Sequence, residues 1–304
     1  MSITITDTML FLSIIAISPA ILFIWYFIHE ARMDKQHIRL MIRTFFLGSL
    51  AIIPVYILNY ISFKLFNFDI QYFLETNDIK ESILYVFLGC VMIATIEEYS
   101  KSIIVREVDW NKKEFTSIVD GIEFAVACGL GFAFIENAIY FIDIHTMVGN
   151  VTSELAYAIV GRSVLSMLAH AVFSGIFGYY YGRAKVLNLH YRRVNVKNRS
   201  YGFHLLHGLR VRLLRFKYLL QSKNLHHEVD EYFKEKELVA EGLLIAIFLH
   251  TLYNFFVMRN LAWVSVILIA AEFYIVIHEV KLHNKKDVHH FEIQGISHSH
   301  SQNS

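Results

Sequence analysis

Residues 117–142 read SIVDGIEFAVACGLGFAFIENAIYFI, and this stretch decides the fold class. A bilayer core of ~30 Å is crossed by about 20 apolar residues in a helix that rises ~1.5 Å per residue. Lipid offers the backbone no hydrogen-bond partner, so only a helix, which satisfies its own backbone, is plausible for such a span. The glycines and alanines of the stretch also allow close contact between helices. We therefore predict a transmembrane helix that packs inside a bundle.

The rest of the chain repeats this pattern. Of the 304 residues 55% are hydrophobic and the mean hydropathy is +0.43, which is too apolar for an ordinary soluble domain. The stretches that are long and apolar enough to span are residues 9–29, 44–63, 82–104, 117–142, 156–182, 238–258 and 261–280. The first lacks a basic segment before it and a cleavage site after it, so we expect a retained helix. The predicted fold class is all-α, a polytopic membrane helix bundle of about seven transmembrane helices.

The charges of the loops predict how the chain lies in the membrane. Basic residues mark the first loop (Arg32, Lys35, Arg39, Arg43) and the third loop (Lys101, Arg106, Lys112, Lys113), and the fifth is heavily basic. The N-terminal tail and the fourth loop have no Lys or Arg, and the second loop is acidic. Cytoplasmic loops carry the excess of Lys and Arg. We therefore predict a multi-pass protein of the cell membrane with its N-terminus outside and its C-terminus in the cytoplasm.

This topology divides the chain into four segments. Residues 1–183 hold transmembrane helices one to five, 184–237 a basic cytoplasmic insert, 238–281 the last two helices, and 282–304 a His-rich cytoplasmic tail. In the insert, apolar residues recur at helical spacing with Arg and Lys between them. This pattern fits either an amphipathic helix on the anionic inner leaflet or a solvated helical hairpin. For the tail we expect an unstructured polar end rather than a metal-binding tract.

Ionisable residues inside the spans are the candidates for function. Each costs at least ~2.5–3.5 kcal/mol at the centre of a membrane helix, so each needs a reason to be there. Near the end of the third span, Lys101 follows Glu97 by four residues and Glu98 by three, and reaches either carboxylate on one helix face. Two interpretations stay open. The three residues form part of a buried site, or the two acids are solvated at a helix end while Lys101 extends to the interface.

Further polar residues lie on the fourth, fifth and sixth spans. The fourth carries Glu136 and Asn137, the fifth a stripe at four-residue steps, and the sixth a pair at the same spacing. The stripe is Arg162, Ser166, His170 and Ser174, and the pair is His250 and Asn254. Counted along the helices, Glu98, His170 and His250 can meet in the inner half of the membrane. Glu136 falls nearer the outer side, level with Arg162, so it belongs either to this cluster or to an ion pair with Arg162.

These motifs together resemble a known family. Glu97-Glu98-x-x-Lys101, Phe132-x-x-x-Glu136-Asn137, His170 and His250-x-x-x-Asn254 occur in the order found in PrsW intramembrane proteases. That family belongs to a wider superfamily, often called CPBP, with the CAAX prenyl proteases. The resemblance covers roughly residues 10–280. It implies an endopeptidase that hydrolyses peptide bonds of membrane-anchored proteins, and PrsW-type members are associated with site-1 cleavage of anti-sigma factors.

The resemblance also implies roles for single residues. Glu97 or Glu98 activates the hydrolytic water, and Lys101 is a charge partner. His250 and Asn254 orient water and stabilise the oxyanion, while His170 is a second proton carrier or a ligand. Glu136 stands where the prenyl-protease branch has a histidine, so the prenyl-protease mechanism does not transfer directly. Asn137 and Arg162 are supporting residues.

A metal remains open at this point. Two histidines and two glutamates offer a donor set for Zn²⁺ with a water in the open position, and the candidates are Glu98, Glu136, His170 and His250. The adjacent-ligand motif HExxH is absent. We favour water activated by glutamate over a metal-assisted reaction.

Two other functions compete with proteolysis. Chains of Glu and His also build proton relays in transporters, which predicts inverted repeats or interrupted helices. Neither is apparent, because the two prolines, Pro19 and Pro54, lie away from the polar cluster. A non-catalytic scaffold or immunity-type family member is the other alternative. The expected partners are a membrane-anchored protein substrate and the lipid bilayer, with no nucleic acid.

Overall fold

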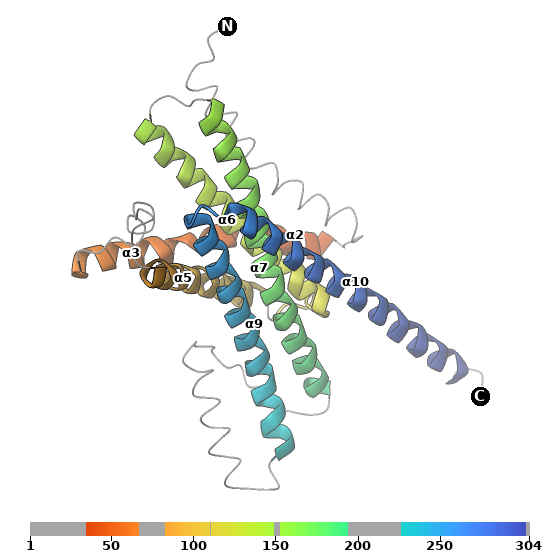
Figure 1. The fold of residues 1–304 in the computed structure, drawn as a ribbon. Coiled ribbons are helices and arrows are strands. Elements are labelled where there is room, and N and C mark those ends of the chain that lie inside the picture. Colours follow the sequence, from red (N-terminus) through yellow and green to blue (C-terminus); the bar gives the residue numbers. More distant parts are fainter. Residues whose placement is uncertain (1–34, 67–82, 110, 149–152, 194–225, 302–304) are drawn as a thin grey trace.

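The computed structural model describes residues 35–66, 83–109, 111–148, 153–193 and 226–301. Within these residues every regular element is an α-helix, which confirms the predicted fold class. The helices are α2 (Lys35–Ser49), α3 (Ile52–Phe66), α5 (Ile83–Asp109), α6 (Ile118–Val148), α7 (Ser153–Arg193), α9 (His226–Met258) and α10 (Ala262–Ser301). In Figure 1, α6, α7 and α9 meet at the centre of the molecule, while α3 and α10 extend from it in different directions.

Six helical stretches in this part of the chain are long and apolar enough to cross a membrane. They are Lys35–Leu65, Ile83–Val108, Ile118–Asp143, Gly161–Leu187, Lys234–Met258 and Ala262–Leu282. They correspond to the second to seventh predicted spans, and they confirm a multi-pass membrane protein. The first predicted span, residues 9–29, lies outside the described residues.

Several helices continue beyond the apolar stretches that predicted them. α7 reaches Arg193 and α9 begins at His226, so both ends of the predicted insert 184–237 are helical, and its middle, 194–225, lies outside the described residues. α10 reaches Ser301, which corrects the prediction of an unstructured tail over 282–304. Hydropathy marks only the part of a helix that suits lipid. Backbone hydrogen bonds carry a helix on through polar residues.

The second predicted span, 44–63, lies within the spanning stretch Lys35–Leu65, but it is not one continuous helix because it divides between α2 and α3. The bonds at the junction are short-range, from Leu50 N to Leu47 O at 3.0 Å and from Ala51 N to Gly48 O at 3.0 Å. Pro54 explains the break. Its missing N–H and its ring exclude a regular helical bond to the carbonyl of residue 50. An interrupted helix is therefore present after all, although it lies away from the polar cluster.

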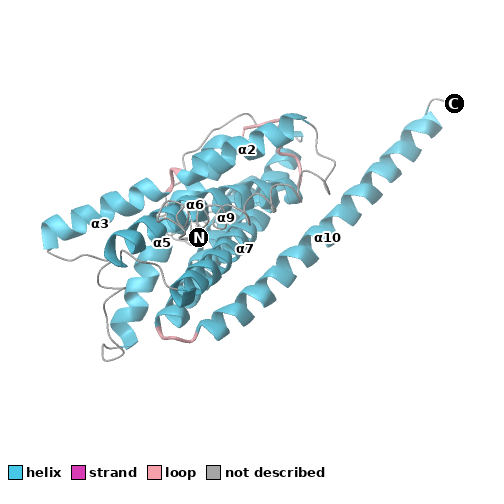
Figure 2. Cartoon of the chain, turned by 90° about the horizontal axis from the view of Figure 1, so that it is seen from above, coloured by secondary structure: helices cyan, strands magenta, loops and turns pink. Residues whose placement is uncertain are grey.

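Helix α6 is the centre of the bundle and packs against α2 and α7. Its first turn is capped by a reciprocal pair in which Ser117 N donates to Asp120 Oδ2 at 2.7 Å and Asp120 N donates to Ser117 Oγ at 3.1 Å. Toward α2, Ser49 Oγ donates to the carbonyl of Gly131 at 2.9 Å, and His37 Nε2 lies 3.0 Å from Glu123 Oε2. Figure 2 shows α10 running along one side of this group.

Small residues allow α6 and α7 to touch. A Cβ at Gly178 would lie 2.7 Å from the Cβ of Ala125 and 2.8 Å from the Cα of Ile122, closer than real Cβ atoms approach. Gly121 and Gly182 continue the same contact along the two helices, so the spacing is small-xxx-small on each. The approach brings the polar stripe of α7 close to α6, and this closeness is what the site requires.

Replacing Gly178 by alanine is expected to destabilise the protein by about 1–3 kcal/mol, because the added methyl group must push α6 and α7 apart. The thermal midpoint of the purified protein in detergent measures this loss. Gly161→Ala is the matched control on the same helix, since a Cβ there would meet nothing within 4 Å. Alanine also favours helix over glycine. An equal fall in the midpoint of both variants would contradict the packing argument.

Candidate active site

The polar residues singled out in the sequence come together from four helices. α5 supplies Glu97, Glu98 and Lys101, α7 supplies His170, and α9 supplies His250. All five are buried, and the last four are each only 2% exposed. The fourth helix, α6, adds Glu136, whose side chain is 25% exposed. The two acids of α5 are therefore not solvated at a helix end, and Lys101 is an interior residue rather than a charge of the third loop.

Glu98 lies at the centre of the cluster. Its Oε1 accepts a hydrogen bond from Lys101 Nζ at 2.5 Å and lies 2.8 Å from His250 Nδ1. A carboxylate only accepts, so Nδ1 of His250 carries the proton. The other ring nitrogen, Nε2, then has a free lone pair, and it lies 3.7 Å from Glu97 Oε2. Glu98 thus fixes both the tautomer and the direction of His250.

Lys101 joins this half of the cluster to the other half. Its Nζ lies 3.0 Å from His170 Nδ1 as well as beside Glu98. An ammonium group only donates, so Nδ1 of His170 accepts and Nε2 carries the proton. That Nε2 lies 3.1 Å from Glu136 Oε2 and donates to it. A continuous chain of hydrogen bonds therefore runs from Glu98 through Lys101 and His170 to Glu136.

Glu136 makes both of the contacts that the sequence left open, one with the cluster and one with Arg162. Besides His170, it accepts a hydrogen bond from Ser166 Oγ at 3.1 Å, and its Oε1 lies 3.8 Å from Arg162 Nη2. Arg162 also donates to Asn137 Oδ1 at 3.3 Å. Glu136 is therefore a member of the cluster and an ion-pair partner of Arg162 at once.

The outer side of the cluster is built by Arg162 and its neighbours. The guanidinium carbon of Arg162 lies 3.7 Å from the centre of the Tyr140 ring. Asn137, which is fully buried, donates from Nδ2 to the carbonyl of Ser163 at 3.3 Å. These contacts tie α6 to α7 beside Glu136. Arg162 keeps 34% of its side chain exposed, so it borders the cluster rather than closing it.

Aromatic rings enclose the two histidines. Phe173 stacks on His250 with centroids 5.0 Å apart and an interplanar angle of 22°, and the Phe132 ring lies 5.1 Å from that of His170. Phe173 was not among the predicted residues, although its place three residues after His170 puts it on the same helix face. Asn254, which was predicted, lies one turn after His250 and is half-buried. Within the described residues it makes no hydrogen bond to the cluster.

The side chains that could hold a metal ion differ from the predicted set, because Glu97 takes the place of Glu98 and Glu136. Glu97, His170 and His250 each offer one ligand atom, and these atoms all lie within 4.8 Å of one another. Of the four predicted candidates, Glu98 is held by Lys101 and His250, and Glu136 by Ser166 and Arg162. Glu97 Oε2 is buried and has no hydrogen-bond partner among the described residues. Two imidazoles and one carboxylate are a usual donor set for catalytic Zn²⁺, so the residues fit such an ion, with His170 Nδ1 meeting the ion in place of Lys101.

The sequence of the chain matches a known protein family. A family model described as PrsW family intramembrane metalloprotease matches residues 36–209. The chain belongs to this family. The match confirms the resemblance and covers Glu97, Glu98, Glu136 and His170, while His250 lies beyond it. Membership and the apolar helices together indicate a membrane-embedded peptidase.

Individual relatives carry the same family name. Protease PrsW of Oceanobacillus iheyensis is 32% identical over 193 residues, which is 64% of this chain and 78% of the relative. Protease PrsW of Halalkalibacterium halodurans is 31% identical over 178 residues, or 59% and 72%. Protease PrsW of Bacillus subtilis is 28% identical over 170 residues, or 56% and 66%. No solved structure matches the chain at a significant level.

Lys101→Met is expected to destabilise the protein by about 3–5 kcal/mol, because it leaves the carboxylate of Glu98 buried without its cation. Adding Glu98→Gln to that variant is expected to restore part of the loss, since the uncompensated charge is then gone. Thermal midpoints of the single and double variants measure the coupling. Lys113→Met is the control, because Lys113 is an exposed lysine in the connection between α5 and α6. Strictly additive losses would show that the pair is not coupled.

Proposed function

We propose that this chain is an intramembrane endopeptidase that hydrolyses peptide bonds of membrane-anchored proteins at the cluster around Glu97 and Glu98. The observation that carries the proposal is the free oxygen of Glu97. It is buried, lacks a hydrogen-bond partner among the described residues, and faces the free nitrogen of His250. A buried polar atom without a partner costs free energy, so a site that keeps one has a use for it.

Two chemistries use this oxygen. In a reaction without metal, Glu97 accepts a proton from the attacking water, and His250 Nε2 orients that water. In a metal-assisted reaction, Glu97, His170 and His250 would hold the ion. When bound, the ion supplies a Lewis acid that polarises the scissile carbonyl. The donor set and the description of the family as metalloproteases support the second chemistry. We therefore prefer it to the metal-free reaction that the sequence favoured.

The remaining residues of the cluster act on these groups. Glu98 and Glu136 accept the N–H protons of His250 Nδ1 and His170 Nε2, as outer partners of ligating histidines do, and an ion on His170 would take the Nδ1 lone pair that Lys101 contacts in the absence of the ion. Glu136 is the most exposed carboxylate of the cluster, and it is the proposed proton carrier of the metal-assisted reaction. As the new C–O bond forms and the C–N bond breaks, it moves a proton from the water to the leaving nitrogen. Arg162 stabilises its charged form.

The substrate and the topology complete the proposal. We infer that the substrate is a single-span membrane protein, with an anti-sigma factor cut at site 1 as the first candidate. That choice rests on the motifs shared with PrsW proteases. The N-terminus lies outside and the C-terminus in the cytoplasm, as the loop charges predict. The superfamily with CAAX prenyl proteases is proposed on the same motifs, with Glu136 as the departure.

Glu97→Gln is expected to lower cleavage at least ~100-fold, because both chemistries need its charged oxygen. The assay places the purified chain and a single-span anti-sigma factor in one liposome and follows the fragments by mass spectrometry. Glu107→Gln is the matched control, since Glu107 is an exposed acid on the same helix. Glu98→Gln is expected to abolish cleavage as well. Full activity in both cluster variants would refute the proposed site.

The purified protein is expected to hold about one divalent metal ion per chain, with zinc as the first candidate. Elemental analysis measures the ion directly, and a chelator is expected to remove both the ion and the activity. His250→Asn is expected to lower the metal content, whereas Glu107→Gln keeps it. Undiminished cleavage by protein without metal would select the glutamate reaction instead.

A further inference from the structure

A basic pocket lies away from the proposed active site, at the start of α2. It is lined by Gln36, Arg39, Leu40 and Arg43 of α2 and by Lys112 and Glu114 of the connection between α5 and α6, and its volume is about 190 Å³. This volume is far larger than the space one water molecule needs. Three of the six side chains are cations and only one is an acid.

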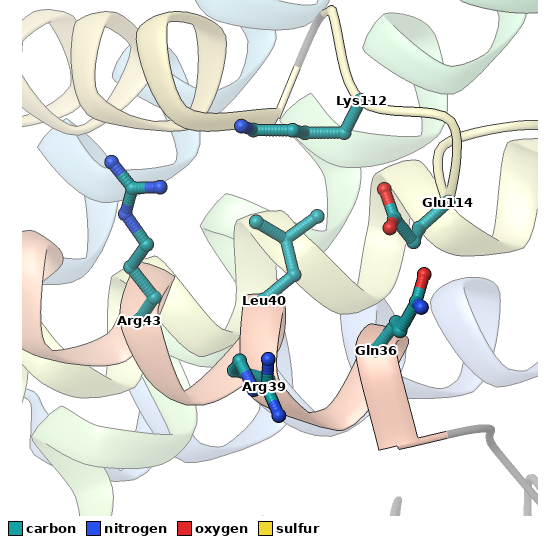
Figure 3. A pocket seen from close by; sticks show the side chains of 6 residues that line it. All are labelled: Gln36, Arg39, Leu40, Arg43, Lys112 and Glu114. Atoms are coloured by element: carbon teal, nitrogen blue, oxygen red, sulfur yellow. The ribbon is translucent and has the colours of Figure 1, made fainter.

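The charges of this pocket are not compensated from within. In Figure 3, Arg43 and Lys112 extend toward one another above Leu40, while Gln36 and Glu114 face one another at the other end. Among the described residues, neither Arg43 nor Lys112 makes an ion pair. Like charges that converge in this way repel one another, and an anion placed between them would remove the repulsion. The arrangement therefore favours a ligand that carries a negative charge.

The pocket also joins two loops that the sequence places on the same side of the membrane. Arg39 and Arg43 belong to the predicted first loop and Lys112 to the predicted third loop, which are about 70 residues apart. Their meeting in one pocket agrees with the alternation of loop charges. The positive-inside rule assigns that side to the cytoplasm, where the leaflet is anionic. Phosphate headgroups of anionic lipids are therefore present on the side of the membrane where the pocket lies.

The outer face of α2 distinguishes a lipid from a soluble anion. Arg39 and Arg43 are exposed on α2. Phe46 follows Arg43 by three residues and is 65% exposed, and Leu50, just beyond the end of the helix, is 50% exposed. From Arg43 to the end of the helix at Ser49 the rise is about 9 Å. Along α2 the exposed cations thus come first and the exposed apolar side chains follow. A phospholipid has the same order, with its headgroup followed by its acyl chains.

We propose that this pocket binds the phosphate headgroup of an anionic phospholipid, with the acyl chains lying along Phe46 and Leu50. A lipid headgroup and a free phosphate would both bind through their phosphate group to the two cations, Arg43 and Lys112. Arginine suits phosphate because its planar group donates two parallel hydrogen bonds. The exposed apolar residues of α2 add the contact that only a lipid can use. The proposal is independent of the peptidase reaction.

The test titrates the purified full-length chain in detergent with phosphatidylglycerol and counts bound lipid by native mass spectrometry. Phosphatidylcholine with the same acyl chains is expected to bind more weakly. Arg43→Gln with Lys112→Gln is expected to weaken phosphatidylglycerol binding about fivefold for each charge removed. Lys234→Gln with Lys281→Gln removes two exposed charges of α9 and α10 that do not line the pocket, and it is expected to change binding less than about twofold. Circular dichroism checks that the variants fold.

A second arm separates lipid from soluble anion. Phe46→Ala is expected to weaken phosphatidylglycerol binding, whereas Phe63→Ala, at an exposed phenylalanine of α3, leaves it unchanged. Glycerol phosphate and inorganic phosphate are expected to compete poorly, since neither has an acyl chain. Equal binding by wild type and the Arg43/Lys112 variant would overturn the site. If glycerol phosphate competed as well as phosphatidylglycerol itself, the pocket would be a site for a soluble anion and the lipid proposal would be refuted.

Discussion

The contact between Lys101 and Glu98 inside the membrane bundle is the constraint on which the site depends. Removing two charges from water costs several kcal/mol for each ion, so the pair persists only where further hydrogen bonds compensate it. His250 and His170 supply them, one on each side. Each histidine thus has one ring nitrogen fixed by a polar contact, His250 Nδ1 with Glu98 and His170 Nδ1 with Lys101. The same contacts that make the charges tolerable therefore also prepare the imidazoles for chemistry.

This arrangement leaves Glu97 outside the network. Glu98 takes the hydrogen bonds of Lys101 and His250, while the outer oxygen of the neighbouring Glu97 meets only the far nitrogen of His250 at 3.7 Å. Two adjacent acids thus receive different tasks. Glu98 contacts His250 and Lys101, and Glu97 keeps a buried oxygen that the proposed reaction would offer to water or to a metal. Both contacts of Glu98 go to its Oε1, so the buried oxygen of Glu97 is a second acceptor beside the same imidazole.

Close helix packing makes the network possible. The side chains of Glu136 and His170 span the short gap between α6 and α7, and Gly129 of α6 brings the helices together there, because a Cβ at this position would lie 2.6 Å from the carbonyl oxygen of His170. In lipid, helices gain little from burying apolar surface against one another, so small residues and interhelical hydrogen bonds carry more of the association. The same bundle leaves α2 at its edge, with one face on α6 and the other free for lipid.

The sequence by itself determined which stretches are apolar and long enough to span, that the chain crosses a membrane, and which polar residues are worth examining. Each of these follows from local quantities, namely the transfer free energy of each side chain and its position along a helix. Only the tertiary structure decided that Lys101 is interior, that Glu97 keeps a buried oxygen without a hydrogen-bond partner among the described residues, and that Glu136 contacts both His170 and Arg162. Adjacent residues point about 100° apart around a helix, so their roles depend on how each helix is rotated and crossed by its neighbours. That rotation is set by packing between distant segments, which no local pattern contains.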